Sequence, residues 1–221
     1  MAEPIRVIVE LGPKGKKCAA FAIDWPGWNR GAKTEEAAVA LHASYRARYR
    51  PIAELAGIAA EFDTAGAPEV MHRYVGTGST DFWGISFAPS DLDLEPITAE
   101  AFERKLSLLN ACWTFFDEVA ASVTPELKKG PRGGGRDRDQ IITHVVLNER
   151  DWAAQVGVDT SAEDIVTDDG RRDHRARYLV ALREHWQAGT HGRSRNLLYL
   201  LRHTAYHTLD HAWEMQDKTL G

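Results

Sequence analysis

The amino-acid sequence predicts an α+β fold, in which a small α/β module over residues 1–95 precedes a four-helix bundle over residues 96–221. Two observations lead to this prediction. Up to Pro96, apolar and polar residues alternate in short runs, as in strands that bury one face. From Thr98 onward, apolar residues recur every three or four positions in long segments, as in helices that bury one stripe. The boundary between the two domains is therefore expected at the Pro96-Ile97-Thr98 step.

The composition is that of a globular protein that binds neither nucleic acid nor membranes. Hydrophobic residues make up 43% of the chain, and the net charge of −5 gives no basic surface for nucleic acid or anionic lipid. No apolar run is long enough to form a signal peptide or to span a bilayer. Cys18 and Cys112 lie far apart without redox or metal-ligand spacing, which favours a reducing, cytoplasmic location.

The N-terminal module is expected to begin with a β-hairpin. Residues 5–11 alternate apolar and polar side chains, Gly12-Pro13-Lys14-Gly15 form a turn, and a second apolar run covers residues 18–24. Trp25-Pro26-Gly27-Trp28 ends this pattern, because proline lacks the N–H donor of a sheet and glycine permits positive φ. Thr34 then caps a helix that runs at least to Arg48 or Tyr49, with Pro51 kinking or restarting it.

Two further strands, residues 68–76 and 81–89, are expected to complete the N-terminal sheet. The turn-rich segment at residues 77–80 separates them. Three tryptophans lie near the expected strand ends, where they either line a pocket or pack in the core: Trp25, Trp28 and Trp83.

The N-terminal motif resembles the HicB-like antitoxin fold. The motif is Phe21-Ala22-Ile23-Asp24-Trp25-Pro26-Gly27-Trp28, followed by Gly31, Thr34, Glu36 and Ala37. In that family, two or three strands lead through a Pro-Gly turn and a glycine-threonine step into a helix. Trp28 occupies the usual small-residue position here, and no DNA-binding segment follows. We therefore expect a module that serves in packing or pairing, rather than an antitoxin that binds an operator.

The C-terminal bundle is expected to contain four helices, each with one apolar stripe. Thr98 caps the first helix and Ser194 caps the last. A connector rich in glycine and basic residues follows the first helix, and we expect a solvated loop there, with contact to an acidic ligand as the alternative. The expected helices cover about residues 98–123, 137–156, 169–188 and 194–217.

Three histidines recur at four-residue steps in the last helix, which places them one turn apart on neighbouring positions. A helical wheel puts His207 and His211 toward one flank of the apolar arc, whereas His203 lies opposite the arc and is expected to be solvated. His144 lies at the margin of the apolar side of the second helix. Two imidazoles one turn apart can hold a divalent cation, and His144 is the best source of a third ligand.

The segment from His207 to Glu214, together with the lone His144 on an earlier helix, resembles the DinB-like superfamily. That family is a four-helix bundle with a three-histidine metal site, one ligand from the second helix and a His-x-x-x-His pair from the last. The resemblance covers about residues 98–221 and implies the ligand set His144, His207 and His211. It also implies thiol-dependent transfer or hydrolysis, with a small-molecule substrate and, for the transferases, a low-molecular-weight thiol.

The sequence alone does not identify the metal or the reaction. Histidine ligands suit zinc, our first candidate, and also nickel or iron. Asp210, Glu149 and Glu214 are near enough in sequence to accept the second N–H of a ligand histidine. Two alternatives remain: a non-enzymatic HicB-like interaction module with a structural bundle, and histidines that only pack or face solvent. The sequence also leaves open whether the protein forms a homodimer.

Overall fold

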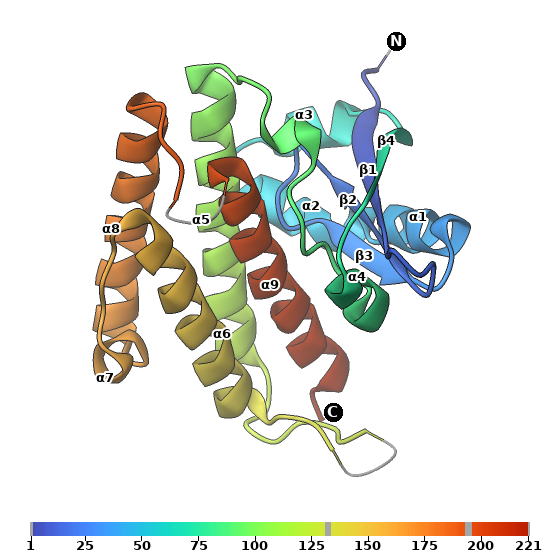
Figure 1. The fold of residues 1–221 in the computed structure, drawn as a ribbon. Coiled ribbons are helices and arrows are strands. Elements are labelled where there is room, and N and C mark those ends of the chain that lie inside the picture. The colour runs from blue at the N-terminus through green and yellow to red at the C-terminus, as the bar shows by residue number, and fades with distance from the viewer. Residues whose placement is uncertain (1, 131–133, 193–195, 221) are drawn as a thin grey trace.

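The computed structural model describes residues 2–130, 134–192 and 196–220. Within these ranges, the N-terminal part carries a four-stranded sheet and the C-terminal part consists mainly of helices (Figure 1). The expected α+β class is therefore confirmed. The expected cap Ser194 lies outside the described residues. No helix in the described part of the chain is both long enough and apolar enough to span a membrane.

The sheet has the order β3-β2-β1-β4, and its strands are β1 (Ile5–Leu11), β2 (Cys18–Ala22), β3 (Asn29–Ala32) and β4 (Pro68–Val75). Strand β1 pairs with β2 in antiparallel fashion, as the expected hairpin requires, and with β4 in parallel. A parallel pair needs a crossover connection. Here the crossover consists of α1 (Glu35–Ser44), α2 (Arg46–Leu55) and α3 (Ala59–Thr64).

The first helix begins as expected but ends early. The Thr34 side chain accepts a hydrogen bond from the Ala37 N–H at the start of α1. The helix then ends at Ser44, and α2 begins after Tyr45, so that Pro51 lies inside α2 and does not mark the break. The Tyr45 ring packs edge-on against Trp213, with centroids 5.1 Å apart. Tertiary packing, and not proline, thus accompanies the change of helix.

The strand expected over residues 81–89 does not form. Thr77 and Thr80 instead make a capping box that starts α4 (Gly78–Trp83). After α4, the N–H groups of Phe87 and Ala88 donate to the buried carboxylate of Glu10 on β1, so a side chain and not a neighbouring strand satisfies them. This segment leads to the short η1 (Asp91–Asp93). The prediction failed because local capping and a buried carboxylate outweighed the apolar pattern.

The expected cluster of three tryptophans does not form either. Trp25 and Trp28 are buried in the core, where Trp28 stacks between His42 and Tyr49. Trp83 is 62% exposed on α4. The sequence left two interpretations open, a pocket lining or core packing, and core packing is therefore confirmed for Trp25 and Trp28.

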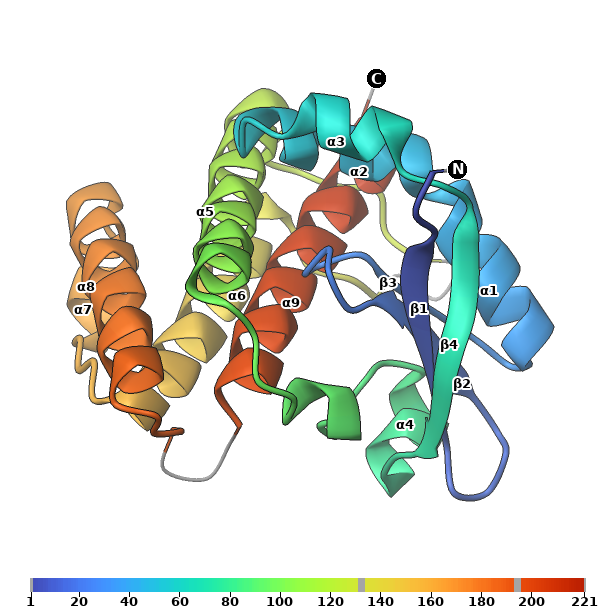
Figure 2. The ribbon, with the colours of Figure 1, turned by 90° about the horizontal axis from the view of Figure 1, so that it is seen from above.

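The helical part contains α5 (Ala99–Ser122), α6 (Arg138–Ala153), η2 (Ala154–Val156), α7 (Ala162–Ile165), α8 (Asp168–Gln187) and α9 (Leu197–Lys218). Thr98 caps α5, as expected, and Asn196 caps α9. Helix α9 lies between α6 and the sheet, whereas α8 lies at the edge of the molecule farthest from the sheet (Figure 2).

Helix α9 joins the two parts of the molecule. Arg202 binds Asp93 with both its Nε and Nη2 atoms at 2.8 Å, and both side chains are buried. Arg30 of β3 binds Asp210 at 2.6 Å. Trp25 and Trp28 belong to the same hydrophobic core as the α5 and α9 side chains. The core thus continues across Pro96-Ile97-Thr98, and the division into domains there stays a prediction.

Candidate metal centre

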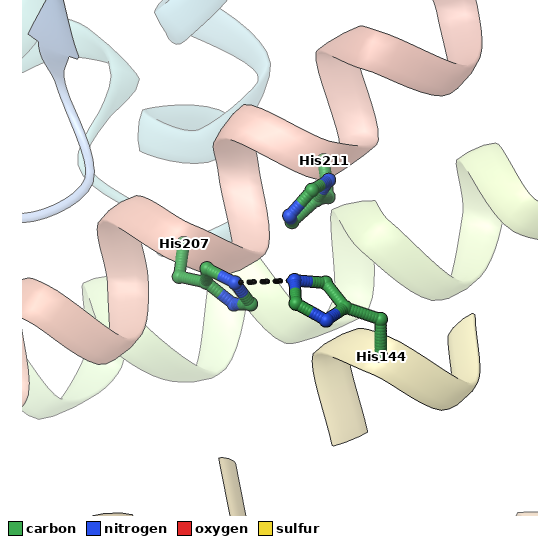
Figure 3. Close-up of side chains that lie close together, drawn as sticks. All are labelled: His144, His207 and His211. Carbon is green, nitrogen blue, oxygen red and sulfur yellow. Dashed lines mark hydrogen bonds between the residues drawn. The ribbon is translucent and has the colours of Figure 1, made fainter. Parts of the chain in front are cut away.

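Helices α6 and α9 bring His144, His207 and His211 together (Figure 3). One ring nitrogen from each of the three lies within 4.8 Å of the other two. The Nε2 atoms of His144 and His207 are 3.2 Å apart. All three side chains are partly buried. These are the three residues that the sequence singled out, and the structure places them in one cluster.

Local sequence accounts for this convergence. The four-residue step between His207 and His211 places both rings on one side of α9, with centroids 4.6 Å apart. On α6, Ile141 and Val145 are fully buried, which turns His144 at the edge of the same face toward α9. A capping box between Asp137 and Gln140 fixes the start of α6.

The donor set fits a divalent cation. Zinc binds imidazole at about 2.0–2.1 Å in a tetrahedral arrangement, so ligand nitrogens stand about 3.3–3.4 Å apart. The separation of 3.2 Å between the Nε2 atoms of His144 and His207 is close to that value. The ring centroid of His211 lies 4.9 Å from that of His144 and 4.6 Å from that of His207, no farther than the 5.0 Å between His144 and His207.

Two of the three imidazoles are held in the neutral form that binds metals. Burial lowers the pKa of His144 to about 4, with a further contribution from His211. Burial, followed by His211 and His144, holds the pKa of His207 well below its usual range. At neutral pH both rings therefore have a free lone pair, as metal ligation requires.

One carboxylate supports the cluster. Glu214 Oε2 lies 2.7 Å from Nδ1 of His211, and Lys218 pairs with the other oxygen of Glu214. The hydrogen bond with His211 is the main reason that the pKa of Glu214 falls to about 2. A carboxylate that binds the outer nitrogen of a histidine directs the other ring nitrogen toward a metal.

The other two acids proposed for this role lie elsewhere. Glu149 is buried and binds Arg175, while Asp210 binds Arg30. The Nδ1 atoms of the other two histidines, His144 and His207, differ in their hydrogen-bond partners. The Asn148 amide lies 3.3 Å from Nδ1 of His144, whereas Nδ1 of His207 is buried without a hydrogen-bond partner among the described residues.

The expectation that His203 is solvated is wrong. His203 is only 5% exposed and stacks on Tyr199, with ring centroids 5.3 Å apart. Phe87, from the loop that follows α4, covers it from the N-terminal part at 5.8 Å. The helical wheel assumed that α9 buries one face, whereas α9 packs against α5, α6 and α8 and also against the N-terminal part. His203 is outside the ligand cluster, as expected.

Trp152 of α6 forms a wall of the centre that the sequence alone did not reveal. Its ring lies edge-on to His207 at 5.0 Å and to His203 at 4.9 Å. The sequence showed Trp152 as one apolar residue of the stripe on α6. Its position next to a ligand histidine follows only from how α6 and α9 pack.

Comparisons of the chain with protein-family models, with curated proteins and with solved structures find no match.

Proposed function

We propose that this protein is a divalent-metal-dependent enzyme of the DinB-like kind, and that His144, His207 and His211 hold the ion. The observation that carries the proposal is the convergence of three ring nitrogens within 4.8 Å from two helices. Zinc is the first candidate, because neutral imidazoles at this spacing suit its tetrahedral geometry, and nickel or iron are alternatives.

The chemistry follows from the donor set. Three nitrogen ligands leave at least one coordination position for substrate. A divalent cation held there supplies Lewis-acid chemistry, which polarises a carbonyl or stabilises a thiolate. Glu214 keeps His211 in a fixed orientation, and Trp152 shields His207 from water on one side. The reaction we propose is transfer to a low-molecular-weight thiol or hydrolysis of a small molecule.

The N-terminal part would act here by supporting the helices, and not by binding DNA. Two antiparallel strands, the Pro26-Gly27 turn and the Thr34-capped helix follow in the order that the HicB-like resemblance implies. Its turn packs onto α9, because a Cβ on Gly27 would lie 3.2 Å from the Ala205 carbonyl oxygen. Arg30 and Phe87 also contact α9 side chains. We therefore propose that this module positions the helix that carries two of the ligands.

Metal content tests the proposal. The protein is purified without chelators and its metals are measured by elemental analysis, with one equivalent of a divalent transition metal as the expected result. Alanine at any of the three ligand positions should abolish stoichiometric binding. His203→Phe is the matched control, because it keeps the ring that packs on Tyr199 and should retain the metal.

The proposal is overturned if wild-type protein contains no metal as purified and binds none after incubation with zinc, nickel or iron(II). It is also overturned if the His203→Phe variant loses metal while His144→Ala keeps it. Turnover of electrophiles with added thiols, compared with hydrolysis of ester and amide substrates, then distinguishes the two reaction classes.

A further inference from the structure

A cavity lies away from the three clustered histidines, between α5, α6 and α8, and has a volume of about 760 Å³. None of the three candidate metal ligands lines it. The volume is within the usual range for sites that bind small molecules, about 300–1,000 Å³. The lining side chains come from α5, α6 and α8, and α8 lies at the edge of the molecule farthest from the sheet (Figure 2).

Guanidinium groups outnumber carboxylates in the wall of this cavity. Four arginines line it, Arg138, Arg171, Arg172 and Arg175, against two acids, Asp117 and Asp168. Arg175 is saturated, because it binds both oxygens of the buried Glu149 as well as Asp117. Arg138 and Arg172 pair with Asp139 and Asp169, which lie outside the wall and are 73% and 93% exposed, so solvent screens these pairs.

Arg171 is the guanidinium best placed to receive a ligand. Its side chain is only 13% exposed, whereas its nearest partner, Asp168 at 2.7 Å, is 86% exposed. Its other partner, Asp117, lies 3.6 Å away and is shared with Arg175. Ion pairs with exposed acids contribute little, so an anion in the cavity can compete with Asp168 for Arg171.

A buried donor in the same wall lacks a partner. Trp113 is 2% exposed, and its indole N–H makes no hydrogen bond with any described residue. A buried donor without an acceptor is costly and calls for an explanation. Trp113 lines the cavity, but its indole nitrogen is enclosed, so an acceptor bound there reaches this N–H only when the neighbouring side chains move aside.

We infer that this cavity binds a small organic anion with an apolar body. Ala120, Ile142 and Leu179, which are partly exposed, contribute apolar surface for the body. The acidic group binds Arg171 and Arg172, because the guanidinium fork matches a carboxylate, sulfonate or phosphate. The site is independent of the proposed metal centre, and it does not rest on the proposed function.

The test uses the protein with all 221 residues and two amphipathic anions. Anilinonaphthalene sulfonate is titrated by fluorescence, and decanoate is used to displace it. We expect saturable binding of one probe per chain, displacement by decanoate but not by decanol, and weakening as salt is added. Arg171→Gln should raise the dissociation constant roughly tenfold or more, since a charge-assisted hydrogen bond is lost.

Two further variants keep the test decisive if Arg171→Gln folds poorly. Arg172 is 76% exposed, so Arg172→Gln should fold normally and raise the dissociation constant severalfold. Arg183→Gln is the matched control, since Arg183 lies on the same helix outside the cavity and pairs with Glu103. It should bind the probe as wild type does, and so should His207→Ala.

Equal probe affinity in wild type, Arg171→Gln and Arg172→Gln would overturn the inference, and so would displacement by decanol as effective as by decanoate. Absence of probe binding would also overturn the inference. If the protein then sediments as a dimer, a second copy covers the cavity in place of an anion. Metal content in these variants is measured separately, so failure here is distinguishable from failure of the metal proposal.

Discussion

Glu214 Oε2 lies 2.7 Å from Nδ1 of His211, three residues earlier on the same helix. This contact decides which ring nitrogen of His211 is available to an ion. Nδ1 is engaged with the carboxylate, so Nε2 is the free one, as for His144 and His207, whose Nε2 atoms face each other. The spacing of three residues keeps Glu214 on the same side of α9 as His211. Glu214 and His211, the candidate ligand, therefore come as one unit of the helix.

The first prediction concerns this carboxylate. Glu214→Gln should lower the affinity for zinc about 10–100-fold without abolishing binding, because an amide is a weaker acceptor for the His211 N–H. Competition with a chromophoric chelator measures the dissociation constant. Asp217→Asn, which removes a carboxylate one turn further that pairs with Arg48, should leave the affinity unchanged. Equal affinities in both variants would remove Glu214 from the metal centre.

The second prediction compares two glycines that both have positive φ. Gly27 has φ of 95°, and a Cβ there would lie 2.6 Å from Leu209 Cδ1 and 3.2 Å from the Ala205 carbonyl oxygen. Gly15 has φ of 62°, and a Cβ there would meet no atom within 4 Å. Gly15→Ala should therefore cost about 1–2 kcal/mol, from the backbone alone. Gly27→Ala should cost about 2–5 kcal/mol, because overpacking against α9 adds about 1–3 kcal/mol.

Urea unfolding of both alanine variants gives the comparison. A loss of stability in Gly27→Ala no larger than in Gly15→Ala would mean that the turn does not pack against α9 as described. Gly27→Ala also bears on the candidate metal centre, because Ala205 and Leu209 flank His207 on α9.

The third prediction concerns the buried ion pair between α9 and the N-terminal part. Arg202→Gln leaves Asp93 buried without its charge partner, and should cost about 3–5 kcal/mol of unfolding free energy. Asp93→Asn should cost a similar amount, and the double variant should cost clearly less than the sum of the two. Urea denaturation followed by circular dichroism measures all three. Additive losses would show that the pair is not coupled.

The same unfolding curves test the expected boundary at residues 95–98. Arg202–Asp93 and the shared core tie the two parts together, so we expect one transition, seen at the same urea concentration by tryptophan fluorescence and by helix content. Two separate transitions would instead support independent folding of residues 1–95 and 96–221.

Some elements could be predicted from the sequence because local chemistry determines them. Strand β1 begins and ends at the expected residues 5 and 11, since a glycine turn follows it, although residues 7–10 are buried on both faces and not on one as the alternation implied. The caps Thr34 and Thr98 were also predictable, because each places an acceptor next to free helix N–H groups. The clustering of His144, His207 and His211 followed from a four-residue step and a resemblance, whereas their role as metal ligands stays a prediction.

The failures share a different cause, which is long-range packing. The sequence predicted a strand over residues 81–89, yet Glu10, over seventy positions earlier, accepts hydrogen bonds from the N–H groups of Phe87 and Ala88. His203 read as solvated, yet Phe87 covers it. The sequence of one helix does not show how many faces of that helix will be covered. For the same reason, the sequence alone does not predict that Trp152 lies beside His207 or that a cavity forms beside α8.

The last prediction concerns acid stability and rests on His42 of α1. This imidazole is fully buried and stacks on Trp28, with centroids 4.4 Å apart and planes 10° from parallel. Neither ring nitrogen has a hydrogen-bond partner among the described residues. Burial, with a smaller contribution from Arg30, lowers the pKa of His42 to about 3. In the unfolded chain the pKa returns to about 6.5.

The unfolded state therefore binds a proton that the folded state excludes, and folding stability should fall as the pH drops from about 6.5 toward 3. A gap of this size corresponds to at most about 4–5 kcal/mol. His42→Phe keeps a ring on Trp28 and should flatten this part of the pH profile. The difference between variant and wild type at pH 8, where the imidazole is neutral in both states, isolates the packing change. If the two profiles stay parallel between pH 7 and pH 4, His42 is not the group that makes the protein sensitive to acid.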